Sequence, residues 1–159
     1  MGDVHVGRVA AAAVRPLRME VLRPGLPAET AVYPGDDDPT TVHFAAEAAG
    51  GIIGIASLYA EARAGGPSPA WRLRGMATAP SVQGTGVGAA VLQACFGYVA
   101  GQGGGELWCN ARISASGFYS RYGLVVVGDE FEVEGIGPHR VMRREIAAEP
   151  GVACADGRP

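Results

Sequence analysis

Residues 71–88, WRLRGMATAPSVQGTGVG, carry the strongest structural signal in the chain. A short apolar run ends before Pro80, a glycine-rich segment follows, and an apolar segment with helical spacing begins after Gly88. The order of strand, glycine loop and helix places free backbone N–H groups at the start of a helix, where the partial positive charge favours an anion. The stretch therefore predicts a phosphate-binding loop.

Two features of the sequence narrow the type of phosphate ligand. All 13 basic residues are arginines, so the lysine of a P-loop and the lysine of a Schiff base are both absent. Gly84, Gly86 and Ala89 fit the dinucleotide pattern G-x-G-x-x-G/A. However, residues 80–83 separate them from the preceding strand, and Glu106 begins the next expected strand instead of ending it. A nicotinamide-dependent oxidoreductase is therefore a weaker alternative, and a glycine-rich turn without a ligand is another.

The composition is typical of a globular domain. The chain has 159 residues, 48% hydrophobic and 18% charged, which predicts one domain over residues 1–149 and a disordered tail over residues 150–159. The net charge of −3 comes from interspersed acids and bases, which gives no basic face for nucleic acid. No apolar run approaches the ~20 residues that span a bilayer, and the N-terminus lacks a signal-peptide pattern. We therefore expect a cytoplasmic protein that does not enter a membrane.

Hydrophobic periodicity predicts a mixed α/β order of elements. Residues 4–9 fit either a first strand or the start of a helix, and residues 11–22 fit a helix with Pro16 in its first turn or at a kink. Gly50 and Gly51 predict a hairpin turn. Further strands are expected at residues 41–48, 52–60, 71–78, 106–111, 124–128 and 138–146, the last two around an acidic segment, and helices at residues 85–100 and 114–122. The cysteines show no metal or disulfide spacing, and we expect Cys95 and Cys109 in the core and Cys154 in the tail.

Residues 83–88, QGTGVG, resemble the acyl-CoA pyrophosphate loop of GNAT-superfamily N-acetyltransferases, Q/R-x-x-G-x-G/A. The resemblance covers roughly residues 15–146, and the sequence of this region is similar to that of a bacterial branch of these enzymes. The further segments that carry it are RGMAT before the loop, WCNAR at residues 108–112, GFYSRYG at residues 117–123 and GIGPH at residues 135–139.

The resemblance implies a fold and an activity. The fold is an α/β GNAT-type mixed, mostly antiparallel sheet, flanked by helices, with a parallel strand pair that splays apart between residues 71–78 and 106–111. The activity is transfer of an acetyl group from acetyl-CoA, the acyl-donor co-substrate, to an amine of a small molecule or peptide by direct attack in a ternary complex. A possible homodimer is implied as well, and no metal. A non-catalytic acyl-CoA-binding module is the alternative that shares the loop.

The resemblance also implies which residues contact the donor. Backbone groups near Met76, Ala77 and Thr78 would bind the pantetheine arm, and one N–H there could polarise the thioester carbonyl. The Asn110 amide would bind a pantetheine amide, although a turn-forming role is the other interpretation, and Ser116 is a possible further contact. The expected pyrophosphate-binding N–H groups are those of Gln83, Gly84, Thr85, Gly86, Val87 and Gly88.

Tyr119 is the candidate catalytic acid. Attack of an amine on a thioester expels a thiolate, and a phenol with a pKa near ~10 can protonate a group whose acid has a pKa near ~8.5. Relatives carry a tyrosine at this position for that purpose. The alternative is a packed aromatic, as expected for Phe118, and Tyr122 is a weaker substitute.

The sequence leaves the general base open. The candidates are Glu47, Glu61, Glu132, Glu134 and His139, of which His139 could equally line the acceptor site or pack in a strand. The strand at residues 71–78 has no acid where many relatives carry a carboxylate, so a chain of waters could serve instead.

Three other groups of polar residues fit a structural or solvated interpretation. Arg18 and Arg23 could bind an anionic substrate but fit a solvated helix face, and His43 fits a structural role in its strand. Residues 36–38, three aspartates before a proline, resemble an acidic metal cluster but fit a solvated loop better, so no metal is assigned.

Overall fold

The structure, a computed structural model, describes residues 3–151. Residues 152–159 of the tail expected over residues 150–159, which include Cys154, lie outside the described residues. The chain forms two compact units: the first contains residues up to 60 together with residues 73–98, and the second contains residues 61–72 together with the chain from residue 99 onward.

The strands form a seven-stranded sheet in the order β1-β2-β3-β4-β5-β7-β6. Strand β4, Ala70–Thr78, begins in the second unit and continues in the first. The predicted parallel pair is confirmed, because β4 pairs with β5, Gly105–Arg112, through a ladder of Ala70 with Glu106, Trp71 with Leu107 and Arg72 with Trp108. The mostly antiparallel α/β architecture expected from the sequence is therefore correct.

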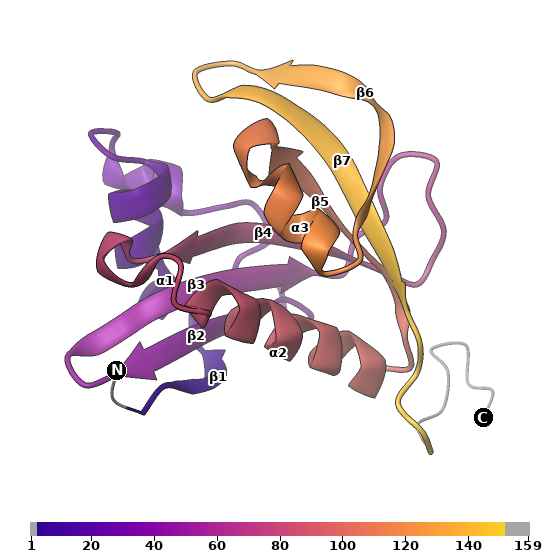
Figure 1. Cartoon of the computed structure of the whole chain (residues 1–159), viewed down its shortest axis with the longest axis horizontal. Coiled ribbons are helices and arrows are strands. Elements are labelled where there is room, and N and C mark those ends of the chain that lie inside the picture. Colours follow the sequence, from indigo (N-terminus) through magenta and orange to yellow (C-terminus); the bar gives the residue numbers. More distant parts are fainter. Residues whose placement is uncertain (1–2, 152–159) are drawn as a thin grey trace. The chain divides into compact units, whose positions relative to one another are not determined.

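The first unit contains the antiparallel strands β1, His5–Val9, β2, Val42–Ala48, and β3, Gly51–Tyr59, which lie side by side in Figure 1. The predicted hairpin turn is confirmed, since Gly50 and Gly51 have φ angles of 101° and 129° that L-residues with side chains rarely adopt. Part of the core consists of Val14, Leu17, Ala45, Ile55 and Ala77.

The helix predicted over residues 11–22 is present, but Pro16 does not lie in its first turn. Helix α1 spans Ala11–Leu17, and residues Arg18–Leu22 continue it as a single π-helical turn in which the N–H of Arg23 donates to the carbonyl of Arg18 at 3.0 Å. Pro16 lies inside α1, beyond its first turn. Because proline has no N–H to donate, the ordinary α-helical bonding is interrupted immediately before the π-helical turn.

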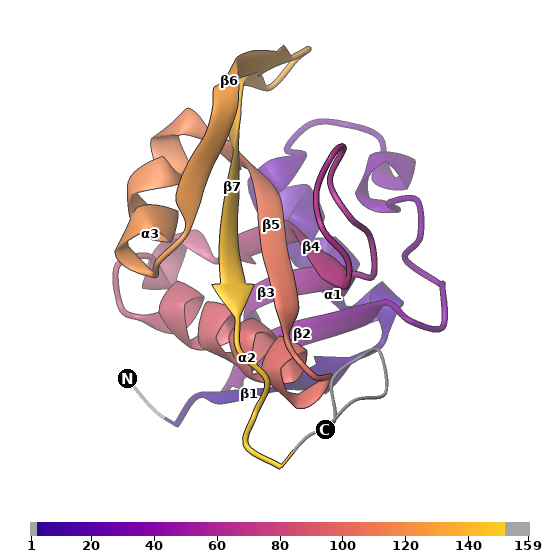
Figure 2. The same cartoon turned by 90° about the vertical axis from the view of Figure 1, so that its right-hand side faces the viewer.

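The second unit holds β5, a 3-10 turn at Ile113–Ala115, helix α3 at Ser116–Arg121, β6 at Val125–Val133 and β7 at Gly137–Ile146. Figure 2 shows β7 between β5 and β6, and both pairings are antiparallel. The acidic segment expected between the last two strands belongs to β6, where the register shifts between Val127 and Phe131. Such an irregularity lets a strand of exposed acidic residues keep its pairing with β7.

Helix α2, Val87–Gly101, begins directly after the glycine loop and ends at the predicted glycine-rich stop. No helix among residues 3–151 is long and apolar enough to cross a membrane.

Candidate functional site

The glycine loop connects β4 to α2 in the first unit. After a 3-10 turn at Pro80–Val82, Gly84 and Gly86 have φ angles of 80° and 94°, and both residues are exposed. A Cβ atom added at either glycine would have no heavy atom within 4 Å. The loop therefore presents open backbone immediately before a helix N-terminus, as an anion-binding loop requires.

Two of the six expected N–H donors in the loop already make turn bonds. The N–H of Gln83 donates to Pro80 O at 3.5 Å, and that of Thr85 donates to Val82 O at 3.3 Å. The Gln83 side chain donates from Nε2 to the carbonyl of Thr78 at 3.2 Å, which ties the loop to the end of β4. These bonds hold the loop in shape while the glycines stay exposed.

Strand β4 contains an irregularity directly before the expected donor contacts. Gly75 has a φ of 66°, and a Cβ atom there would lie 3.0 Å from Nε of Arg18 and 3.2 Å from the Tyr33 ring. The turned backbone at Gly75 changes the direction of the strand just ahead of Met76, Ala77 and Thr78. Only glycine fits this position both by conformation and by space.

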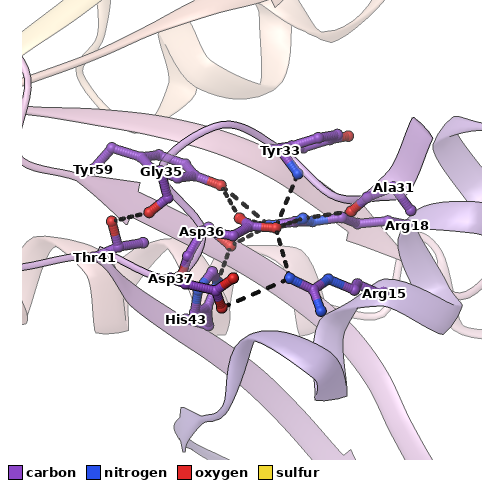
Figure 3. Close-up of polar contacts among 11 residues, drawn as sticks. Arg15, Arg18, Ala31, Tyr33, Gly35, Asp36, Asp37, Thr41, His43 and Tyr59 are labelled. Atoms are coloured by element: carbon purple, nitrogen blue, oxygen red, sulfur yellow. Dashed lines mark hydrogen bonds and ion pairs between the residues drawn. The ribbon is translucent and has the colours of Figure 1, made fainter. Parts of the chain in front are cut away.

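The residues that line Gly75 belong to a buried polar network, which we call the Arg18 network (Figure 3). Arg18 is completely buried, and its guanidinium makes a bidentate pair with Asp36 at 2.7 and 3.0 Å. It also donates to the carbonyl of Ala31 and to the hydroxyls of Ser57 and Tyr59, at 2.7, 2.9 and 3.2 Å. The solvated interpretations of Arg18 and of Asp36 are therefore wrong.

A helical signal in the sequence pointed to this burial. Val14, Leu17 and Arg18 follow the spacing of one helix face, and the first two are buried core residues. An arginine in an apolar stripe needs a buried anion. The run of aspartates supplied one, but nothing local marks Asp36 as that partner, since the two residues lie 18 positions apart.

The network shifts the pKa of its members. Burial alone would raise the pKa of Asp36, but hydrogen bonds from Arg18, from the Tyr59 hydroxyl and from the Tyr33 N–H outweigh it and hold that pKa well below its usual range. Burial, together with the bond to Asp36, raises the pKa of Tyr59. Both groups therefore keep one protonation state around neutral pH, which is typical of a structural network.

His43 completes the network from β2. Its Nε2 lies 3.0 Å from the carbonyl of Asp36, which can only accept, so Nε2 carries the hydrogen in that bond. Its Nδ1 lies 2.6 Å from the Ser57 hydroxyl. The expected structural role of His43 is confirmed.

The second unit holds the candidate acid. Tyr119 on α3 is buried, with 8% of its surface exposed, and its ring packs edge-on against Phe118 with the centroids 5.3 Å apart. Phe118, expected in the core, is only half-buried, and its ring also contacts Tyr122 at 5.2 Å. The short helix thus turns Tyr119 inward in place of Phe118.

The other expected donor contacts of this unit lie near α3 in the sequence. Asn110 is exposed on β5, opposite Val141 of β7, so its amide is open to a ligand. The Ser116 hydroxyl donates to the carbonyl of Ile113 at 2.7 Å and closes the 3-10 turn before α3.

The five candidate bases differ in burial. Glu47, Glu61, Glu132 and Glu134 are exposed, and Glu61 pairs with Arg72 at 3.5 Å. His139 is buried, and its Nδ1 lies 2.8 Å from the carbonyl of Gly137. Because a carbonyl only accepts, Nδ1 donates in this bond, which leaves Nε2 of a neutral ring with its lone pair.

Glu106 is engaged in a second buried ion pair. Its carboxylate accepts from Arg63 Nε at 2.8 Å and from Arg143 Nε, and the glutamate is 1% exposed. An acid held in this way does not serve the ribose contact of a dinucleotide site.

The remaining candidates are the cysteines and the residues that could group around a metal ion. Burial raises the pKa of the Cys95 and Cys109 thiols to about 12, and the expected core positions of both are confirmed. Within residues 3–151 no three His, Cys, Asp or Glu side chains are grouped to hold a metal ion.

Comparison with known proteins identifies the family. The family model of the acetyltransferase (GNAT) domain matches residues 29–146. The uncharacterized N-acetyltransferase YitI of Bacillus subtilis (strain 168) is 31% identical over 134 residues, which cover 82% of this chain and 88% of YitI. An acyl-CoA N-acyltransferase from Pseudomonas aeruginosa has a similar fold, with a TM-score of 0.73 and 19% identity over 89% of this chain and 99% of the other.

An aminoglycoside 6'-N-acetyltransferase complexed with coenzyme A is also similar, with a TM-score of 0.72 and 13% identity over 92% of this chain and 99% of the other. No finding favours a nicotinamide-dependent oxidoreductase or a non-catalytic binding module. The chain belongs to the GNAT family of acetyltransferases, enzymes that transfer an acyl group from acetyl-CoA to an amine.

Proposed function

We propose that this enzyme binds acetyl-CoA with β4 and the loop that follows it, and that the acceptor amine attacks the thioester directly in a ternary complex. The observation that carries the proposal is the exposed backbone at Gly84 and Gly86 before α2. Phosphate oxygens can approach this backbone closely, and the helix N-terminus supplies partial positive charge. An acidic protein can bind a polyanion in this way because the attraction is local.

In this proposal, backbone groups of Met76, Ala77 and Thr78 bind the pantetheine arm. The irregular backbone at Gly75 supports this role, because it turns the strand directly before these residues. An N–H of this segment also stabilises the oxyanion that forms when the amine adds to the thioester carbonyl. Asn110 offers an exposed amide for a pantetheine amide, and Ser116 is a weaker contact because its hydroxyl already closes a turn.

Tyr119 acts as the general acid in the proposed mechanism. The amine nitrogen forms a bond to the thioester carbon, the carbon–sulfur bond breaks with its electron pair on sulfur, and the thiolate takes the phenolic proton of Tyr119. Solvent then returns a proton to the tyrosine. The buried position of Tyr119 supports the role, since a poorly solvated acid next to a forming thiolate transfers its proton efficiently.

The proton of the attacking amine goes to His139 in this scheme. The hydrogen bond from Nδ1 to the carbonyl of Gly137 orients the ring and leaves Nε2 as the proton acceptor. The four alternative glutamates are exposed, and water solvates such carboxylates well.

The test is a pair of tyrosine substitutions. Tyr119→Phe removes the acid and should lower kcat by about 100-fold or more, while the Kd for acetyl-CoA, measured by calorimetry, stays unchanged. Tyr122→Phe, which removes a hydroxyl from the same short segment, should leave kcat within about 3-fold. Equal loss in both variants, or unchanged turnover in Tyr119→Phe, would remove Tyr119 from the mechanism.

The donor is tested separately by thermal stabilisation. Acetyl-CoA should raise Tm and NAD should not. Release of free thiol with a panel of small-molecule and peptide amines then identifies the acceptor. A cytoplasmic location and a homodimer remain proposals from the sequence, and sedimentation of the purified enzyme tests the dimer.

A further inference from the structure

Three guanidinium groups surround one aromatic ring in the first unit. Arg18 and Arg74 lie 4.0 and 4.1 Å from the centroid of the Tyr33 ring, and Arg23 lies 5.6 Å from it. Tyr33 itself is 5% exposed, so the ring is a buried platform for these cations. We call Arg23, Tyr33 and Arg74 the Tyr33 platform.

The charge of Arg23 is not balanced by an acid among residues 3–151. Asp36 is the buried carboxylate of the region, and its two ion pairs are with Arg18 and Arg15. Among residues 3–151, Arg23 has no carboxylate oxygen within 4.0 Å of its guanidinium, and its buried Nε has no hydrogen-bond partner. Gathering positive charge next to a poorly solvated ring is unfavourable unless an anion joins it.

The position of Arg74 in β4 indicates which anion the Tyr33 platform binds. Arg74 stands two residues before Met76, the first of the proposed donor contacts, and Gly75 between them packs against both Arg18 and Tyr33. An anionic group held beside the Tyr33 ring would thus lie next to the strand that binds the thioester in the proposed function.

From this geometry we propose that the Tyr33 platform binds a carboxylate of the acceptor, so that the preferred substrates are amines that also carry an acidic group, such as amino acids. The inference rests on the proposed function for the location of the donor. Arg23 supplies the N–H groups, because no acid pairs with its guanidinium among residues 3–151, and the Tyr33 ring lies beside the guanidinium groups. Arg18 contributes charge without direct contact, because its two terminal nitrogens are occupied by the Arg18 network and its Nε is buried.

The kinetic test compares acids with their amides. The acceptors are glycine, β-alanine and 4-aminobutyrate, each paired with its carboxamide, so that charge is removed while the amine is kept. The wild-type enzyme should prefer the acids, and Arg23→Gln should lower kcat/KM for the preferred acid by about 10- to 100-fold, as expected for a lost charge-assisted hydrogen bond. Its kcat/KM for the carboxamide should change by less than about 3-fold.

Arg8→Gln is the matched control. Arg8 lies over a different ring, 5.4 Å from the centroid of Tyr98 in the same unit, and is exposed. This variant loses the same charge from the chain and should keep the preference for acids. A wild-type enzyme that uses acids and carboxamides equally, or a preference that survives in Arg23→Gln, would overturn the proposal.

If none of these amines is acetylated, a binding measurement tests whether the Tyr33 platform binds a carboxylate. Malonate at fixed ionic strength should raise the Tm of the wild-type and Arg8→Gln proteins but not that of Arg23→Gln, and equal shifts in all three would overturn the proposal. Failure of the proposed function is distinct, because it would show as no stabilisation by acetyl-CoA and no thiol release with any amine.

Discussion

Two carboxylates are buried among residues 3–151, each held by two arginines, and these arginines differ in their access to water. Asp36 and Glu106 have side chains that are 1% and 0% exposed. The side chain of Arg18, the main partner of Asp36, is 0% exposed, whereas those of Arg63 and Arg143, the partners of Glu106, are 19% and 29% exposed. Every hydrogen bond of Arg18 is made inside the protein, and its buried Nε has no partner. Arg15, the second arginine on Asp36, is 27% exposed, and the arginines of Glu106 can also turn to solvent.

The two buried carboxylates also differ in what they connect: Asp36 belongs to a network that positions β4, whereas Glu106 links neighbouring strands. The Arg18 network joins the loop that holds Asp36 to the π-helical turn after α1, to β2 and to β3, and it fills the space beside Gly75 in β4. The Glu106 pair ties strands β5 and β7 to the segment that precedes β4. We infer that the Arg18 network sets the shape of the strand proposed to bind the donor.

Removing the Asp36 carboxylate should have the largest effect. Asp36→Ala leaves the fully buried Arg18 without its anion and should lower the free energy of unfolding by about 3–5 kcal/mol, as measured by urea denaturation. Asp37→Ala is the control, because that side chain is 85% exposed and its ion pair with Arg15 is long, at 3.9 Å. It should change the stability by less than about 0.5 kcal/mol, and a similar loss in both variants would contradict the importance of burial.

The buried pair of Arg18 and Asp36 could not be predicted from the sequence, although most of the architecture could. Strands, α2 and the loop at residues 83–88 follow from local patterns, namely apolar periodicity and glycine spacing. The pairing of Arg18 with Asp36 depends on partners that are distant in the sequence, and three adjacent aspartates give no local sign of which one is buried. The inward turn of Tyr119 instead of Phe118 also depends on packing that periodicity over a six-residue helix does not fix.

The parts of the candidate site that depend on local sequence could likewise be predicted, and those that depend on distant partners could not. The glycine loop is a local signal, and its exposed glycines agree with the prediction. Gly75 was visible only as part of a family motif, because its requirement for glycine comes from the Arg18 and Tyr33 side chains that pack against it. Arg23 was named from the sequence as a residue that could bind an anion, but its grouping with Tyr33 and Arg74 was not predicted, since these residues come from separate segments of the chain.

A methyl group at Gly75 should disturb the Arg18 network from its β4 side. Gly75→Ala combines an unfavourable φ of 66° with contacts of 3.0 and 3.2 Å and should cost about 2–4 kcal/mol of unfolding free energy. Gly84→Ala is matched in conformation, with a φ of 80°, but its Cβ meets nothing within 4 Å. It should cost only about 1 kcal/mol, and equal losses would show that backbone strain, without packing, explains Gly75.

The second carboxylate should be easier to replace. Glu106→Gln keeps the shape of the side chain, and Arg63 and Arg143 can be solvated when the charge is lost, so we expect a loss of about 1–2 kcal/mol in urea denaturation. Glu145→Gln removes the other carboxylate near Arg143, at 3.7 Å and 65% exposed, and should have no measurable effect. A loss for Glu106→Gln as large as that for Asp36→Ala would mean that the access of the arginines to water does not distinguish the two pairs.

The smallest expected effect is the response of the Asp36 carboxylate to acid. The pKa of Asp36 is depressed in the folded protein, so the stability it contributes is present above the unfolded-state pKa of about 3.9 and is lost as the pH falls below it. Between pH 5 and pH 3 this one group should cost about 1 kcal/mol of unfolding free energy. Tyr59→Phe removes one of the hydrogen bonds that depress this pKa, so Asp36 of the folded variant begins to protonate at a higher pH than in the wild-type protein. The two proteins should lose stability equally between pH 5 and pH 3, and the variant should lose less than the wild type below about pH 3. Urea denaturation at each pH measures both slopes, and equal slopes below about pH 3 would mean that carboxylates other than Asp36 govern the acid response there.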